Sequence, residues 1–145
     1  MATTAQWYGQ APGLIMSARW LAQDLRAILM KNTYVPDTDN HLRYTDISAQ
    51  ELAAGGGYTV GGKSFTAKAA SYDAAANEMN LQGADISWGP GATFTVRYAV
   101  IYEADTTDKF LWGLVDFGAD QPVASGTFTL DWATNILAVS QGPAV

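Results

Sequence analysis

The stretch Gly57–Ser64, which reads GYTVGGKS, is the part of this sequence whose residue types and spacing could do chemistry. It satisfies the pattern G-x-x-x-x-G-K-[ST], in which backbone N–H groups and a lysine hold the phosphates of a nucleotide. Leu114–Asp116 is similar to the apolar strand that ends in a magnesium-binding aspartate. Such a site needs a buried parallel strand before the glycines and a helix after them. Neither flank fits, because Glu51–Gly56 is not strand-like and Phe65–Lys68 alternates, so we expect a solvated turn.

Three other groups have residue types that could bind a metal or assist catalysis. Asp37, Asp39 and Asn40 are similar to the start of a calcium loop, but the later Gly and Glu are missing at the required spacing. Asp116–Gly118 spells the magnesium triplet of protein kinases in a chain of 145 residues, which is too short for a kinase. His41 is the only histidine and there is no cysteine, so no nucleophile–base pair is indicated. We therefore expect no catalytic residue, no cofactor and no metal site, with a loosely held ion at residues 37–40 left open.

The composition limits the classes of partner. The chain carries 8 Lys and Arg against 14 Asp and Glu, which gives a net charge of −6, and its basic residues are scattered singly. Direct nucleic-acid binding is not expected, because no basic patch is available to neutralise phosphates. No apolar run reaches the roughly 20 residues of a membrane span, and no basic region precedes an apolar run at the start of the chain. Only 15% of the residues are charged and 12% are aromatic, which favours a protein that completes its burial against a neighbour.

A hairpin over Ala92–Gly118 is the element around which the rest of the chain is expected to be organised. From Thr93 to Glu103 apolar and polar side chains alternate with a period of two, which is typical of a strand. Asp105–Asp108 supplies a polar turn, and Lys109–Phe117 returns antiparallel. The second limb is more densely apolar than alternation allows. It is therefore either a central strand covered on both faces or a strand with a bulge near Gly113.

The remaining segments predict an all-β fold. Ser48–Glu51 has the pattern of a capping box and predicts one short helical turn through Leu52, whereas Asp24–Tyr34 fits a strand or a helix. We expect a polar loop at Ala119–Gly126. Further short strands are expected at residues 58–60, 64–72, 78–81, 84–88, 127–132 and 136–139. With about eight or nine strands, residues 21–145 predict a single-domain antiparallel β-sandwich or jelly roll.

Residues 1–20 are interrupted by Gly9, Pro12 and Gly13 and fit neither a helical nor a strand pattern well. We interpret them as an extended N-terminal arm, with one short strand at most, over Leu14–Arg19. The arm carries bulky apolar residues outside the segments that have a regular strand pattern, namely Trp7, Tyr8, Leu14 and Trp20. These four either close the domain's own core or dock on a partner subunit, and they are the candidate partner-binding residues.

A series of short motifs runs in a fixed order from about residue 24 to residue 138. They are YVPD at 34–37, DISAQE at 46–51, GYTVGG at 57–62, YDAA at 72–75, ADISW at 84–88, RYAVIY at 97–102, DFG at 116–118 and GTFTL at 126–130. Taken together, these segments resemble a group of small proteins encoded among the virion structural genes of tailed bacteriophages and prophages. The match departs from the group's pattern at the aromatic arm, residues 1–20.

The resemblance implies a non-enzymatic capsid decoration, or cement, protein without a cofactor. Such a protein sits on the outer surface of the virion head, binds the lattice of the major capsid protein and stabilises it. A homotrimer, with no nucleic-acid or membrane partner, is the expected form. The resemblance also implies that the GYTVGG run is a hairpin. The alternative is a tail or tail-fibre component that binds host glycan through an exposed Trp88 or Trp112, although either could instead be a core residue, and we expect Trp112 to be one.

Overall fold

The structure is a computed structural model that describes residue 5 and residues 7–140. The chain divides into two compact units, and each is made of segments that are distant in the sequence. The long-hairpin unit contains Gln23–Phe65 and Asp85–Asp131. The helix-sheet unit contains the segment that ends at Ala22, the segment Thr66–Ala84 and the segment that begins at Trp132.

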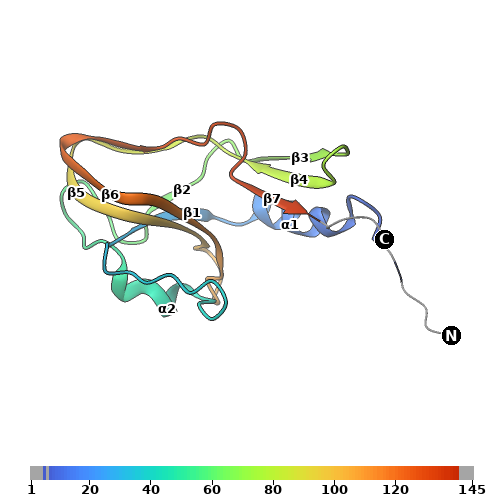
Figure 1. The fold of residues 1–145 in the computed structure, drawn as a ribbon, viewed down its shortest axis with the longest axis horizontal. Coiled ribbons are helices and arrows are strands. Elements are labelled where there is room, and N and C mark those ends of the chain that lie inside the picture. The colour runs from blue at the N-terminus through green and yellow to red at the C-terminus, as the bar shows by residue number, and fades with distance from the viewer. Residues whose placement is uncertain (1–4, 6, 141–145) are drawn as a thin grey trace. The chain divides into compact units, whose positions relative to one another are not determined.

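The long-hairpin unit is built on a four-stranded antiparallel sheet with the order β2-β1-β5-β6. Its strands are β1 (Leu25–Met30), β2 (Lys63–Ser64), β5 (Ile86–Glu103) and β6 (Leu111–Leu130). The two long strands β5 and β6 run side by side along the unit (Figure 1). Strand β1 pairs with the second half of β5, from Met30 opposite Tyr98 to Leu25 opposite Glu103. The core strand β1 is therefore buried between two neighbours.

A short helical segment covers one face of this sheet. It consists of α2 (Tyr44–Ile47) followed by a 3₁₀ turn at Ser48–Gln50 (Figure 1). Ile47 packs into a cluster of buried side chains from β1, β5 and the loop between β1 and α2. The other buried members of the cluster are Ile28, Met30, Tyr34, Val100 and Tyr102.

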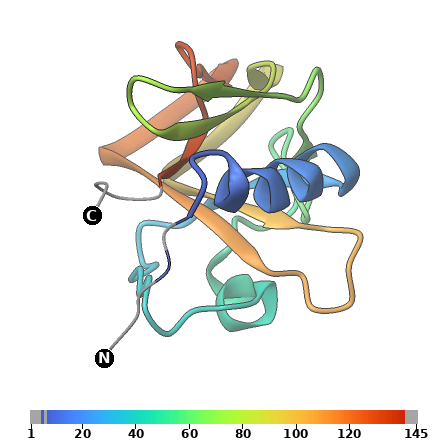
Figure 2. The same ribbon diagram turned by 90° about the vertical axis from the view of Figure 1, so that its right-hand side faces the viewer.

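The helix-sheet unit consists of a three-stranded antiparallel sheet and one helix. The sheet has the order β3-β4-β7, with β3 (Ala69–Asp73), β4 (Glu78–Gln82) and β7 (Leu137–Ser140). The helix α1 (Ala11–Ala22) lies along this sheet and contacts all three strands (Figure 2). Segments from near both ends of the described chain therefore meet on one small sheet.

The structure confirms the predicted all-β class with antiparallel sheets, as in a β-sandwich, together with a short helical segment. The predicted hairpin is confirmed, with Tyr98 opposite Asp116 and Val100 opposite Leu114. Its register shifts between Ile101 and Tyr102, so the bulge that was one alternative for the second limb is present near Gly113. The other alternative is wrong, because β6 is an edge strand of its sheet.

Two boundaries of the hairpin differ from the prediction. The expected loop at Ala119–Gly126 lies within β6, because β5 continues upstream to Ile86 and pairs with residues 121–123 and with Gly126, with register shifts on either side of these residues. The residues Gly89–Gly91 do not end a strand either. They lie in β5 where the register shifts between Trp88 and Ala92, so turn-forming residues serve a bulge here. Among the described residues the structure has seven strands rather than eight or nine.

The predicted capping box at Ser48–Glu51 is wrong. The helical turn begins earlier, and Ser48 is the residue that ends α2. Asp46 supplies the local acceptor instead, since its Oδ2 atom accepts hydrogen bonds from the backbone N–H groups of Leu42 and Arg43 at 2.9 and 2.8 Å. Glu51 points to tertiary partners that a local motif does not reveal. The ambiguous segment Asp24–Tyr34 forms the strand β1.

The prediction of an extended segment at Leu14–Arg19 is also wrong, because these residues lie in α1. Pro12 lies in the first helical turn, where its missing N–H leaves no hydrogen bond unmade. The residues that follow it are mostly good helix formers. Trp20 is fully buried, and its indole N–H donates to the backbone carbonyl of Gln82 at 3.0 Å. Trp20 thus belongs to the core of the helix-sheet unit and is removed from the candidate partner-binding residues.

Candidate functional site

The side of α1 that faces solvent is almost entirely apolar. Leu14 is 53% exposed and Ile15 is 71% exposed. Helical spacing places Ala18, Leu21 and Ala22 on the same side, and all three are exposed. Arg19 is the one charged residue on this face of the helix. We call this side of α1, together with Trp7 and Tyr8, the outer apolar surface.

The side of α1 that faces the sheet carries small residues and one tryptophan. Gly13, Ser17 and Trp20 are buried, at a spacing of four and then three residues. A Cβ atom added at Gly13 would lie 2.3 Å from Cβ of Met79, so the helix backbone approaches β4 as closely as a glycine permits. The Ser17 hydroxyl donates to the carbonyl of Leu14 within the helix at 3.0 Å. The helix therefore hides its small residues and presents its large aliphatic ones.

The outer apolar surface contains three of the four residues that the sequence singled out. Trp7 is 66% exposed and Tyr8 is 89% exposed, and Leu14 of α1 lines the same groove as Tyr8. Ile15 and Leu21 belong to the same surface but were not chosen from the sequence. A helical reading of residues 11–22 would have found them, because Leu14, Ile15, Ala18 and Leu21 share one side of a helix.

An open groove adjoins this surface at the N-terminal end of α1. Its lining includes Tyr8, Gly9, Leu14 and Tyr72. A Cβ atom added at Gly9 would lie 2.2 Å from the hydroxyl oxygen of Tyr72, so the chain passes closely over β3 here. The exposed Tyr8, the partly buried Tyr72 and a leucine thus surround a hollow that an apolar side chain of a partner could fill.

The stretch that matches the phosphate-binding pattern forms a tight turn rather than a strand–loop–helix unit. Gly55 and Tyr58 bridge each other, and Lys63–Ser64 is the edge strand β2. The backbone N–H of Gly61 donates to Oε1 of Glu51 at 2.7 Å. The Lys63 ammonium donates to the carbonyl of Ser87 at 2.6 Å and lies over the ring of Trp88. The groups that a phosphate would use are thus held by the protein itself.

Glu51 is the centre of a buried polar cluster. Its side chain is 4% exposed, and besides Gly61 it accepts hydrogen bonds from the hydroxyl groups of Tyr44 and Tyr58, the latter at 2.5 Å. The Tyr58 oxygen in turn accepts from the backbone N–H of Leu29 at 3.1 Å. Burial first, and then the hydrogen bond to Glu51, raises the pKa of both tyrosines. This cluster ties the loop before β2 to strand β1, which is a structural role.

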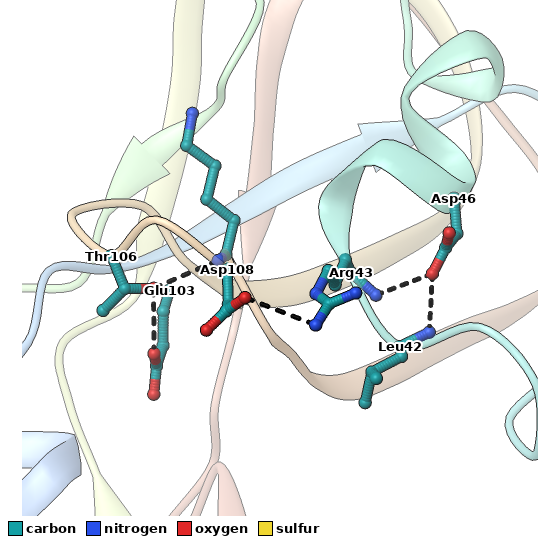
Figure 3. Close-up of polar contacts among 7 residues, drawn as sticks. Leu42, Arg43, Asp46, Glu103, Thr106 and Asp108 are labelled. Atoms are coloured by element: carbon teal, nitrogen blue, oxygen red, sulfur yellow. Dashed lines mark hydrogen bonds and ion pairs between the residues drawn. The ribbon is translucent and has the colours of Figure 1, made fainter.

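Two further acidic residues, Glu103 and Asp108, make contacts in the turn between β5 and β6. Asp108 also links this turn to the loop that precedes α2. Glu103 accepts a hydrogen bond from the Thr106 hydroxyl at 3.2 Å, and Thr106 accepts from the N–H of Lys109 at 3.1 Å. Figure 3 shows these contacts beside the ion pair of Arg43 with Asp108 at 3.3 Å. That pair is half exposed, so it contributes little to stability. The buried Glu103 has the larger structural role.

The loop with Asp37, Asp39 and Asn40 is closed by its own hydrogen bonds. Oδ1 of Asp37 accepts from the N–H groups of Asp39 and Asn40 at 3.2 and 3.1 Å, and Oδ2 accepts from the Asn40 amide at 2.9 Å. These bonds, led by the one from the Asn40 side chain, lower the pKa of Asp37. In the part of the chain that the structure describes, no group of three or more His, Asp or Glu residues is arranged to hold a metal ion.

The two tryptophans proposed for glycan binding differ in accessibility. Trp88 is 1% exposed, and its ring lies near those of Tyr58 and Phe128, so it is a core residue and the hypothesis of an exposed Trp88 is wrong. Trp112 is half-buried, and its indole N–H donates to Oε1 of Glu103 at 2.9 Å.

No helix within the described residues is long and apolar enough to cross a membrane. Comparisons of the chain with protein-family models, with curated proteins and with solved structures found no match.

Proposed function

We propose that this chain is a structural protein of a tailed-bacteriophage virion that binds the outer surface of the major capsid protein lattice and stabilises the head. The observation that carries the proposal is the outer apolar surface. A helix in which the large aliphatic residues face solvent and the small ones face the core is expected where a partner covers it. The order of the turn motifs between residues 24 and 138 supports the choice of a virion protein.

The chemistry of such attachment agrees with the kind of surface present. A protein that reinforces a lattice binds many equivalent positions through modest apolar contacts and gains strength from avidity. A trimer that spans three neighbouring capsid subunits would link them without a strong single contact. The net charge of −6 suits a position outside a shell filled with nucleic acid, since it gives no attraction to phosphate.

Electron microscopy of virion shells that lack this protein, mixed with the purified protein, tests the proposal. We expect density at regular positions on the head and a higher temperature of DNA release. Ile15→Glu should weaken attachment about tenfold or more, because it places a charge in the middle of the apolar contact. The matched control is Val35→Glu, since Val35 is 77% exposed and belongs to the long-hairpin unit rather than to the unit that contains α1.

Three results would contradict the proposal. Bare heads with label only on the tail would favour the alternative of a tail or tail-fibre component. The absence of added density on both heads and tails would overturn a virion role. Equal loss of attachment in both glutamate variants would show that added negative charge weakens attachment in general, so that the outer apolar surface is not the contact.

A further inference from the structure

A small pocket in the long-hairpin unit has features of a ligand site that the proposed function does not use. It lies between the loop that follows β1 and the beginning of β6, and its volume is about 150 Å³. A cavity of about this volume in another protein accepts a benzene molecule. Its lining includes three residues with aromatic rings, Tyr34, His41 and Trp112, together with Asp37 and Thr38. The pocket thus has room for one compact group among aromatic rings.

The rings are held in place by contacts with one another and with residues outside the lining. The indole N–H of Trp112 is tied to Glu103, which is fully buried. Tyr34 stacks on His41 with ring centroids 5.9 Å apart, and the edge-to-face contact of Tyr34 with Tyr98 has a centroid distance of 5.6 Å. Because these rings are already ordered, a ligand would lose little affinity to ordering them.

His41 is positioned by the same loop. Its Nδ1 atom accepts a hydrogen bond from the backbone N–H of Asp37 at 3.3 Å and lies 3.3 Å from the Tyr34 hydroxyl. The backbone N–H of His41 donates to the carbonyl of Asp37 at 2.9 Å. The histidine ring and the Asp37 carboxylate are therefore fixed in one rigid turn.

The charge of the pocket is negative. Asp37 has a lowered pKa, so its carboxylate is ionised at neutral pH. No Lys or Arg side chain is among the residues that line the pocket. Within the described chain, none of the ion pairs formed by Lys or Arg involves Asp37. The faces of aromatic rings are negative as well, so the pocket combines two sources of attraction for a cation and has no Lys or Arg side chain to attract an anion.

We propose that this pocket binds an organic cation of the size of a quaternary ammonium group. A trimethylammonium head is compact and apolar at its surface, and it is attracted both by ring faces and by a nearby carboxylate. The arrangement of Tyr34, His41 and Trp112 beside Asp37 provides both attractions. An inorganic cation would need several oxygen ligands, and among the lining side chains only the Asp37 carboxylate and the hydroxyls of Tyr34 and Thr38 carry oxygen. The proposal does not depend on the virion role.

Calorimetric titration of the purified full-length protein with choline tests the proposal. The matched ligand is 3,3-dimethylbutan-1-ol, in which a carbon atom replaces the charged nitrogen at nearly the same size. We expect saturable binding of choline and no binding of the alcohol at the same concentrations. If the alcohol binds as well as choline, or if neither binds, the proposal is wrong.

Asp37→Asn removes the charge but keeps an oxygen that can accept the N–H groups of the turn. We expect choline to bind about fivefold more weakly to this variant. The control is Asp73→Asn, because Oδ1 of Asp73 accepts the N–H groups of Ala75 and Ala76 in a similar turn but does not line the pocket. An equal loss in both variants, or no loss in Asp37→Asn, would show that net charge or adventitious contact holds the choline and would overturn the assignment.

Discussion

At the scale of single residues, Glu51 is the carboxylate that links α2 to the loop before β2. It accepts three hydrogen bonds, from Tyr44, Tyr58 and Gly61, while almost fully buried. Glu51→Ala leaves these donors without an acceptor, and we expect a loss of about 3 kcal/mol or more in the free energy of unfolding. Urea unfolding of the two proteins measures this difference.

Two milder variants show whether the hydrogen bonds are responsible. Glu51→Gln keeps one acceptor oxygen, and Tyr44→Phe removes only one of the three bonds. Each should lower the free energy of unfolding by less than Glu51→Ala does. A loss as large in Tyr44→Phe as in Glu51→Ala would mean that ring packing, rather than the hydrogen-bonded cluster, determines the effect.

The buried tyrosines also predict how stability changes with pH. Burial is the largest cause that raises the pKa of Tyr34, Tyr44, Tyr58 and Tyr102 above the ordinary value of 10.0. Above that pH the unfolded chain loses these protons while the folded chain keeps them, so the folded state becomes less stable as pH rises. We expect full stability from these groups below pH 10 and a progressive loss above it.

Urea unfolding at a series of alkaline pH values measures this slope, and the ultraviolet absorbance of tyrosinate reports the ionisation. Tyr58→Phe should reduce the slope by up to one proton, because it removes one group with a raised pKa. A slope identical to that of the unchanged protein would show that Tyr58 ionises equally in the folded and unfolded states.

At the scale of elements, the contact of α1 with β4 depends on Gly13. Helix propensity alone predicts that Gly13→Ala stabilises the helix by about 1 kcal/mol. The added Cβ would lie 2.3 Å from Cβ of Met79, which is attached to the backbone and cannot turn away. We therefore expect a net destabilisation of about 1–3 kcal/mol, as for other overpacked sites.

The matched control for Gly13→Ala is Ile15→Ala, which changes the solvent-facing side of the same helix. Its effect on the free energy of unfolding should stay within about 0.5 kcal/mol. Thermal or urea unfolding compares the two. If Gly13→Ala proves more stable than the unchanged protein, the helix does not approach β4 as closely as described.

At the scale of the whole molecule, residues 1–20 cannot be removed without damage to the helix-sheet unit. They contain most of α1, including Trp20, which is fully buried. Their deletion would expose Met79 and Leu81, and each buried apolar side chain of this size contributes roughly 1.5–3 kcal/mol. We expect that the peptides of β3, β4 and β7 lose protection against hydrogen exchange.

Deletion of residues 1–6 is the control, because it ends before Trp7 and leaves α1 complete. This shorter deletion should keep the protection of all three strands. If the deletion of residues 1–20 also kept it, the helix would be dispensable, as the interpretation of these residues as an extended arm required.

The sequence predicts the secondary structure correctly where the local hydrophobic pattern agrees with the burial of side chains in the folded protein. The alternation from Thr93 to Glu103 predicts a strand, and this strand pairs as expected because its apolar side lies on the core. The same reasoning fails at α1. Its buried residues Gly13 and Ser17 are small, while Leu14 and Ile15 are exposed. A hydrophobic pattern would therefore place the solvent-facing side of this helix in the core.

The two candidate sites were not equally accessible to sequence reasoning. Trp7, Tyr8 and Leu14 were chosen as candidates because they are bulky apolar residues outside the segments with a strand pattern, and all three are exposed. The pocket was not found, since Tyr34 and His41 meet Trp112 only through the packing of a loop against a distant strand. Glu51 was misassigned to a local cap for the same reason, because its partners lie seven residues before it and seven and ten residues after it.

The helix-sheet unit is made of segments that are distant in the sequence, so its parts leave the ribosome at different times during synthesis. Strand β4 needs β7 as a neighbour, and β7 leaves the ribosome more than fifty residues later than β4. Strands β5 and β6 of the other unit are synthesised after β4 and before β7. Until β7 has been synthesised, α1 and the β3–β4 hairpin have only each other to cover their apolar side chains. The nascent chain therefore passes through a long interval in which the outer apolar surface and an incomplete sheet are exposed together, and this interval is when chaperone capture or misassembly between copies would occur.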